Sequence, residues 1–158
     1  MKLAIIGLGY VGLANVAYLV SHGQKDVVAF DRDESKISLL KASRFPFNEL
    51  VLNDVLKKEA KKIIYTSAEK DLADADGYFV AVGTPSKEDG TADLSFLDDA
   101  LNTIEKASKG SNIVIRSTVP VGTAKKVADR LASFHVISMP EFLAEGRSYE
   151  DESSPYRL

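Results

Sequence analysis

Short apolar runs alternate along the chain with longer stretches in which apolar residues recur at every third or fourth position. The short runs predict buried strands, and they lie at residues 3–6, 26–30, 62–65, 77–82, 112–116 and 135–138. The longer stretches predict helices, and they lie at residues 11–21, 34–42, 50–61, 95–107 and 123–133. Strands and helices that alternate in this way favour a parallel sheet covered on both faces. We therefore predict a Rossmann-type, doubly wound α/β domain with three α/β/α layers and a mainly parallel sheet.

Polar residues mark the ends of these elements. Thr66 and Glu69 have the spacing of a capping box, which predicts a further short helix up to Ala73, and Ser95 is expected to cap the helix that follows it. Residues 86–93 are polar and predict a surface loop. We assign residues 1–146 to the α/β domain, and we expect residues 147–158 to form a polar tail that runs into a truncated strand.

Composition and charge agree with one ordinary globular domain. The chain has 158 residues, of which 45% are hydrophobic and 27% are charged, and its formal net charge is −3. A slightly acidic chain lacks the positive footprint that nucleic acid requires, so we expect no nucleic-acid partner. No apolar run approaches the roughly 20 residues that cross a bilayer. We therefore expect no membrane association and a cytoplasmic location.

Metal and thiol chemistry have few candidates in this sequence. It contains no cysteine, which excludes disulfides, thiolate ligands and cysteine nucleophiles. The two histidines, His22 and His135, lie at a predicted helix end and at the start of a predicted strand. We expect both to be structural or exposed, and we predict no metal site.

The sequence G-L-G-Y-V-G at residues 7–12 follows the first predicted strand and opens the first predicted helix. A G-x-G-x-x-G motif in this context is typical of dinucleotide-binding domains. Gly7 allows the tight turn, Gly9 lets the backbone approach a pyrophosphate, and Gly12 lets the helix pack against the strand. The helix N-terminus then presents free N–H groups and partial positive charge to the phosphates. The alternative is a plain turn with close packing and no ligand.

Asp31 follows Gly12 by 19 residues and ends the second predicted strand. A carboxylate in this place accepts the hydroxyl groups of the adenosine ribose and repels the 2′-phosphate of NADP, so we predict NAD as the cofactor. Arg32 argues the other way, because a nearby arginine accommodates that phosphate, but Asp31 and Asp33 flank it. Asp31 has a second interpretation as the N-cap of the following helix.

Three further motifs lie where predicted strands end, at the edge where open α/β sheets bind ligands. They are V-G-T-P at 82–85, S-T-V-P-V-G-T at 117–123 and P-E-F-L-A-E-G at 140–146. Together with the glycine motif, and in this order, they resemble the UDP-glucose/GDP-mannose dehydrogenase family over essentially the whole chain. Phe142 stands where relatives acting on N-acetylated sugars carry arginine, which favours the branch that acts on UDP-glucose. Met139 departs from the asparagine that is frequent before the Pro-Glu pair.

The resemblance implies the family's chemistry for a full-length enzyme. Such enzymes oxidise the C6 alcohol of a nucleotide sugar, here UDP-glucose, to a carboxylate with two NAD, by way of an aldehyde and a cysteine thioester. The implied cofactor-binding residues are Gly7, Gly9, Tyr10, Val11, Gly12, Asp31, Lys36, Thr84, Thr118 and Glu145. The implied substrate-binding residues are Glu141, Phe142, Leu143, Ala144 and Glu145. Thr118, Glu141 and Glu145 are the implied catalytic residues, with Thr118 and Glu141 positioning the water or proton acceptor.

Simple chemistry supports part of this assignment. Glu141 and Glu145 are four residues apart, so a helical turn would place both carboxylates on one face, where burial and mutual repulsion favour general-base work. The alternative for this pair is an exposed acidic helix start. Thr118 also has an alternative, as a hydroxyl that caps the turn after its strand.

The resemblance further implies parts that this sequence does not contain. Family enzymes continue with a dimerising helix and a second α/β domain, which carries the cysteine nucleophile and most UDP contacts. We therefore expect a homodimer for the full-length enzyme, and we expect this chain alone not to complete the oxidation. Three alternatives stay open: a stand-alone NAD-binding or sensing module, a domain of a GDP-mannose or UDP-N-acetylmannosamine dehydrogenase, and a hydroxyacid-type dehydrogenase that shares only the glycine motif.

Overall fold

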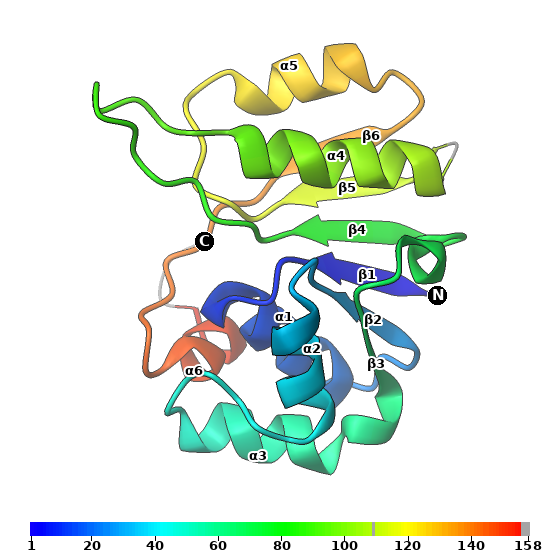
Figure 1. Ribbon diagram of the computed structural model, residues 1–158, viewed down its shortest axis with the longest axis vertical. Coiled ribbons are helices and arrows are strands. Elements are labelled where there is room, and N and C mark those ends of the chain that lie inside the picture. Colours follow the sequence, from blue (N-terminus) through cyan, green and yellow to red (C-terminus); the bar gives the residue numbers. More distant parts are fainter. Residues whose placement is uncertain (109, 156–158) are drawn as a thin grey trace.

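A single six-stranded sheet organises the protein (Figure 1). The computed structural model describes residues 1–108 and 110–155. The strands are β1 (Leu3–Ile6), β2 (Val27–Phe30), β3 (Ile63–Thr66), β4 (Gly77–Val80), β5 (Asn112–Ile115) and β6 (His135–Ser138). They lie in the order β3-β2-β1-β4-β5-β6, and every pairing between neighbours is parallel. This order confirms the predicted doubly wound α/β fold, in which the chain turns back at β1 to build the second half of the sheet.

Helices cover both faces of the sheet, which gives the three predicted layers (Figure 1). They are α1 (Tyr10–Ser21), α2 (Glu34–Lys41), α3 (Leu50–Lys58), α4 (Ser95–Ala107), α5 (Thr123–Arg130), α6 (Ser148–Ser153), and the 3₁₀ turns η1 (Ala60–Lys62) and η2 (Glu69–Leu72). Helices α1, α2 and α3 pack on one face, and α4, α5 and η2 pack on the other.

The two cores follow from the alternation of side chains along each strand. Ala4 and Ile6 of β1 join the core beneath α4, whereas Ile5 between them joins the core beneath α1. Because both faces are covered, all residues of β1 are buried, which explains why the strand is a continuous apolar run. A fully buried side chain such as Ile5 contributes about 1.5–3 kcal/mol to the stability of the fold.

Two predicted helix caps differ from the structure. Thr66 lies at the end of β3, where its hydroxyl donates to Asp71 (2.6 Å) and accepts from the backbone N–H of Ala68 (3.0 Å). The capping box therefore does not form, and only the short 3₁₀ turn η2 follows. The predicted cap Ser95 is instead the first residue of α4, and its N–H donates to the Asp93 carboxylate (2.9 Å).

The polar segment after residue 146 is not a tail, because residues 148–153 form helix α6 against α1 and α3 (Figure 1). Ser148 and Asp151 of this helix are buried. Glu49, itself buried, accepts hydrogen bonds from the Ser148 N–H (2.8 Å) and from the Ser148 hydroxyl. Polar residues can be buried when each has a hydrogen-bond partner. The polar sequence of this segment therefore did not predict a buried helix. Most of the truncated strand predicted at the end of the chain lies outside the described residues.

Candidate functional site

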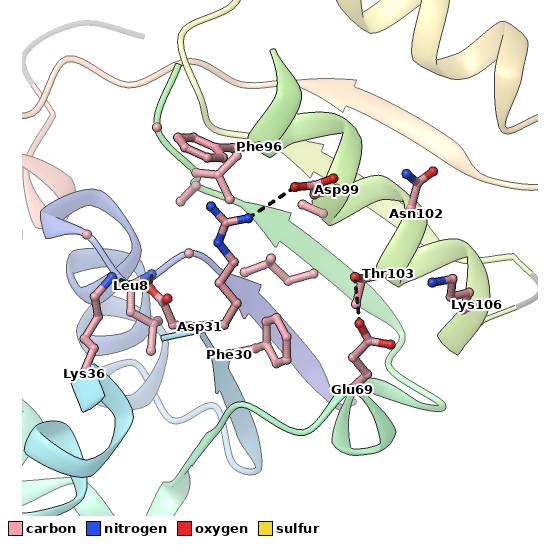
Figure 2. Close-up of a pocket in the computed structure, with 18 residues that line it drawn as sticks. Leu8, Phe30, Asp31, Lys36, Glu69, Phe96, Asp99, Asn102, Thr103 and Lys106 are labelled. Atoms are coloured by element: carbon pink, nitrogen blue, oxygen red, sulfur yellow. Dashed lines mark hydrogen bonds and ion pairs between the residues drawn. The ribbon is translucent and has the colours of Figure 1, made fainter. Parts of the chain in front are cut away.

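A cleft of about 550 Å³ opens at the carboxyl edge of the sheet between β1 and β4, where the strand order reverses (Figure 2). Its walls come from the turn after β1, the ends of β2 and β4, and one side of α4. The connections that follow β1 and β4 run to opposite faces of the sheet and leave a gap between them. Open α/β sheets bind ligands in this crevice. The fold therefore supplies the cleft, and the glycine motif supplies one of its walls.

The glycines of residues 7–12 shape that wall by their lack of a side chain. Gly7 has φ +90°, and a Cβ on it would lie 2.7 Å from the Ala81 carbonyl oxygen. A Cβ on Gly12 would lie 1.9 Å from the Gly7 carbonyl oxygen, so α1 can approach the turn only with glycine here. At Gly9, in contrast, no atom of residues 1–108 or 110–155 outside its chain neighbours lies within 4 Å of the position of a Cβ. The space in front of Gly9 is where our prediction places the pyrophosphate.

Helix α1 directs its positive end at the same space. Gly9 is its N-cap residue, no side chain within the described part of the chain caps its first N–H groups, and its first turn contains no acidic residue. Uncapped N–H groups at a helix start attract anions, and a dinucleotide pyrophosphate meets this requirement. The open surface at Gly9 and the helix terminus thus fit the same ligand group.

Asp31 connects the glycine turn to the end of β2. Its buried carboxylate accepts hydrogen bonds from the Leu8 N–H (2.9 Å), from the Asp33 N–H (3.1 Å) and from the Lys36 ammonium group (2.6 Å). Asp31 is therefore not the N-cap of α2. That role belongs to Asp33, which accepts from the Ser35 and Lys36 N–H groups.

Asp31 and Lys36 form one side of the cleft at the place predicted for the adenosine ribose (Figure 2). Hydrogen bonds from two backbone N–H groups and one ammonium group orient the Asp31 carboxylate before any ligand arrives. A carboxylate held in this way is ready to accept ribose hydroxyl groups. The same negative charge opposes a phosphate group in its place.

The opposite wall was not predicted from the sequence. Phe96, Asp99 and Thr103 reach into the cleft from α4, and the Thr103 hydroxyl donates to the Glu69 carboxylate (3.3 Å), which joins η2 to α4 (Figure 2). Nothing in the spacing of these residues marks them as cleft residues. The one available signal was that α4 follows β4, whose end adjoins the switch point of the sheet.

Thr84 and Thr118 lie together where β4 and β5 end. The Thr84 hydroxyl donates to the Thr118 carbonyl oxygen (2.7 Å), and the neighbouring Ser117 hydroxyl donates to the Val82 carbonyl oxygen (2.6 Å). The side chain of Thr118 is exposed. The described residues that line the cleft include neither threonine, so the structure pairs these two residues outside the cleft lining.

Residues 140–146 form an irregular loop, and the helical turn considered for Glu141 and Glu145 is absent. The Glu141 carboxylate accepts a hydrogen bond from the Leu143 N–H, which closes a local turn. The Ala144 N–H donates to the Asp151 carboxylate (3.1 Å), and the Gly146 N–H donates to Glu49 (3.0 Å). Buried carboxylates on neighbouring elements satisfy these N–H groups, so the loop has no need of helical hydrogen bonds.

The loop nevertheless lies beside the start of α1. Burial raises the pKa of the Tyr10 phenol, and the negative charges of Glu141 and then Glu145 raise it further. Tyr10 also packs edge-on against Phe47, with 6.2 Å between the ring centroids. The two glutamates therefore act electrostatically on the Tyr10 side chain from a distant part of the chain, without sharing a helix face.

A buried ion pair lies behind the loop. Arg116, directly after β5, binds Glu152 of α6 with 2.6 Å between nitrogen and oxygen. Burial raises the pKa of the Glu152 carboxyl group, the Arg116 charge opposes this shift, and Glu141 adds to it. The pair borders a second cavity of about 400 Å³, which is also lined by Pro140 and Phe142.

Comparison with known proteins agrees with this geometry. Residues 1–158 match the UDP-glucose/GDP-mannose dehydrogenase family, NAD binding domain. The chain belongs to this family. It is therefore an NAD-binding domain with the Rossmann fold, and both the resemblance of its motifs and the predicted cofactor are confirmed. The adjacent glycine turn, helix terminus and Asp31 are the features of the structure that fit this cofactor.

Relatives of this domain differ in the sugar that their names give. The UDP-glucose 6-dehydrogenase of Rickettsia typhi is 39% identical over 100% of this chain, which spans 38% of that protein. A UDP-glucose dehydrogenase structure from Pyrobaculum islandicum has a TM-score of 0.90 and 32% identity, covering 98% of this chain and 39% of that one. The structure of a ternary complex of GDP-mannose dehydrogenase from Pseudomonas aeruginosa has a TM-score of 0.89 and 31% identity, with the same coverage. The chain thus spans well under half of these relatives.

Among the described residues, no helix has both the length and the apolar character needed to cross a bilayer. The two histidines are exposed, and His22 stacks on Tyr18 with 4.1 Å between ring centroids.

Proposed function

We propose that this chain is the NAD-binding domain of a UDP-glucose 6-dehydrogenase, which converts UDP-glucose, two NAD and water into UDP-glucuronate and two NADH. The observation that carries the proposal is the cleft at the switch point, with the uncapped start of α1 on one side and the oriented Asp31 carboxylate beside it. When bound, NAD would supply the acceptor for each hydride removed from the sugar. The chain's own residues would hold the cofactor and order the substrate around it.

The parts of the cofactor would lie along the cleft in the order in which they are joined in NAD. The pyrophosphate would face Gly7, Gly9 and the first residues of α1, including Tyr10 and Val11, with Gly12 keeping the helix close. The adenosine ribose would bind Asp31, with Lys36 beside it. We assign the nicotinamide end to the side of Thr84 and Thr118, because these residues follow β4 and β5, on the far side of the glycine turn from β2.

The loop at residues 140–146 would receive the nucleotide sugar, with contacts from Glu141, Phe142, Leu143, Ala144 and Glu145. The electrostatic interaction of Glu141 and Glu145 with Tyr10, the first residue of α1, supports this placement. Thr118 and Glu141 would position the water or accept the proton, and Glu145 would contact both ligands. The oxidation also requires a cysteine nucleophile, which this chain lacks. The chain alone is therefore proposed to bind NAD without turnover, and the full-length enzyme to act as a cytoplasmic homodimer.

UDP-glucose is proposed over other sugars because Phe142 follows the Pro-Glu pair and because relatives named UDP-glucose 6-dehydrogenase share 39% identity. The GDP-mannose dehydrogenase structure, with nearly the same TM-score, makes GDP-mannose the competing substrate. The proposal is tested by measuring NADH absorbance with the proposed full-length enzyme, whose own second half supplies the remaining substrate contacts. We expect turnover with UDP-glucose and little with GDP-mannose or UDP-N-acetylmannosamine. A preference for either of the latter would refute the substrate assignment.

Titration of the unmodified chain with NAD tests the cofactor cleft separately from the sugar. We expect saturable heat of binding in calorimetry and no NADH formation when UDP-glucose is added. Production of NADH by this cysteine-free chain would contradict the proposed division of labour between the two halves.

A further inference from the structure

Arg32 extends from the end of β2 across the cleft to α4. Its Nη1 atom lies 3.2 Å from the Asp99 carboxylate, and its guanidinium carbon lies 4.7 Å from the centroid of the Phe96 ring. Phe96 and Asp99 both project from the first turns of α4 toward this end of the cleft, and Figure 2 marks the contact at Asp99 with a dashed line. Two partners on another element thus determine where the guanidinium lies.

The position of this guanidinium matters because Arg32 directly follows Asp31. An arginine near the adenosine ribose accommodates the 2′-phosphate that distinguishes NADP from NAD. Lys36, the other cation next to Asp31 in the cleft lining, is already bound to Asp31 at 2.6 Å. The selectivity of the site therefore depends on whether Arg32 is free to turn toward the ribose or is kept at α4.

We propose that Asp99 and Phe96 are specificity-determining residues, which keep Arg32 away from the 2′ position and hold its guanidinium as a flat platform beside the adenine. The proposal rests on the NAD placement proposed above. With the pyrophosphate at the glycine turn and the ribose at Asp31, the base occupies the remaining end of the cleft, beside the Arg32 guanidinium and along Glu69 and Thr103. A guanidinium is planar and stacks on aromatic rings, so it suits both Phe96 and an adenine ring.

The exposure of this arrangement makes it easy to test. The side chains of Arg32 and Asp99 are 65% and 63% exposed, so their ion pair contributes little to the stability of the fold. Neutralising Asp99 should therefore release Arg32 without unfolding the protein. A released guanidinium could then bind a 2′-phosphate with charge-assisted hydrogen bonds.

The experiment compares Asp99→Asn with Asp98→Asn in the 158-residue chain, with NAD and NADP titrated separately by calorimetry. Asp98 is the matched control, because it is the preceding residue of α4, is 63% exposed, and pairs with Arg130 (3.5 Å) rather than with a cleft residue. We expect Asp99→Asn to tighten NADP binding about tenfold, which corresponds to one charge-assisted contact, and to change the NAD Kd less than about threefold. Asp98→Asn should change neither Kd by as much as twofold.

A second pair of variants shows whether Arg32 carries the effect. In an Arg32→Ala background, Asp99→Asn should no longer tighten NADP binding beyond the effect of Asp98→Asn. Phe96→Leu should shift NADP affinity in the same direction as Asp99→Asn, by a smaller factor. Equal effects of the two aspartate variants, or a gain in NADP affinity that persists without Arg32, would overturn the inference while leaving the NAD site intact. Failure of the unmodified chain to bind NAD would overturn both.

Discussion

Gly9 and Gly12 belong to one motif, yet the structure predicts opposite outcomes when each is replaced by alanine. At Gly12 the new Cβ would lie 1.9 Å from the Gly7 carbonyl oxygen, whereas real Cβ atoms stay beyond 3.0 Å. The clash is between backbone segments, so α1 must move away from the turn by about 1 Å. Overpacking of this kind costs about 1–3 kcal/mol, and a clash between backbone segments belongs in the upper part of this range. After the ~1 kcal/mol that alanine gains over glycine in a helix, a net loss of about 1–2 kcal/mol is expected.

At Gly9 the backbone has φ −76° and ψ −170°, which any residue adopts, and a Cβ would meet none of the described neighbours within 4 Å. Gly9→Ala should therefore leave the free energy of unfolding within about 1 kcal/mol of the unmodified chain, on the stabilising side. The added methyl group would, however, occupy the surface that the pyrophosphate approaches. We expect NAD affinity to fall at least about tenfold, a loss of ~1.4 kcal/mol in binding free energy.

Two assays separate these outcomes. Urea and thermal unfolding should show Gly12→Ala melting about 2–8 °C lower than the unmodified chain, with Gly9→Ala nearly unchanged. Calorimetric titration with NAD should show the loss of affinity in Gly9→Ala, where the fold is intact. A Gly9→Ala variant that binds NAD normally would refute the placement of the pyrophosphate. A fully stable Gly12→Ala would show that close packing of α1 on the turn is not required.

Three further predictions concern carboxylates. Asp31→Asn should weaken NAD binding about tenfold and reduce discrimination against NADP, because the amide loses the charge that favours ribose hydroxyls over a phosphate; unchanged Kd values in calorimetry would contradict this. Glu49→Gln should destabilise the chain by about 2–3 kcal/mol in urea unfolding, since Ser148 loses charged acceptors, while the exposed control Asp54→Asn stays within about 0.5 kcal/mol. Asp33 has a pKa below its usual 3.8, owing first to the hydrogen bond from the Ser35 hydroxyl. The stability that its charged form adds is therefore present above pH 3.8 and is lost as the pH falls through the lower pKa of the folded state. Asp33→Asn should remove this part of the pH dependence of the urea midpoint, and identical acid profiles would show that the cap does not contribute.

The strands and the glycine turn were predictable because their causes are local. A strand covered on both faces needs apolar residues throughout, and the run at residues 3–6 shows this directly. Gly7 and Gly12 are required by contacts within one strand–turn–helix unit, and Asp31 ends the neighbouring strand at a regular distance. Each of these features depends on residues that are close in sequence or on the fixed geometry of adjacent parallel strands.

The opposite wall of the cleft could not be predicted, because it depends on how α4 is placed in the fold. Phe96 and Asp99 occupy ordinary helix positions, and their role follows from the side of α4 that faces β2 across the switch point. The sequence pattern identifies which side of a helix is apolar. It does not identify which polar residues beside that apolar side line a cleft. Tertiary packing alone brought Arg32 to these residues, over a separation of 67 positions in the chain.

Local apolar patterns and backbone sterics specify the sheet, its covering helices from α1 to α5, the glycine turn and the acidic residue beside it, so these features could be predicted. The ends of the site depend instead on contacts between distant parts of the chain. Helix α6 exists because Glu49, 99 positions away, accepts hydrogen bonds from Ser148, and the loop at residues 140–146 is irregular because Glu49 and Asp151 bind its N–H groups. Buried polar groups are stable only with partners, and those partners come together only when distant parts of the chain have folded.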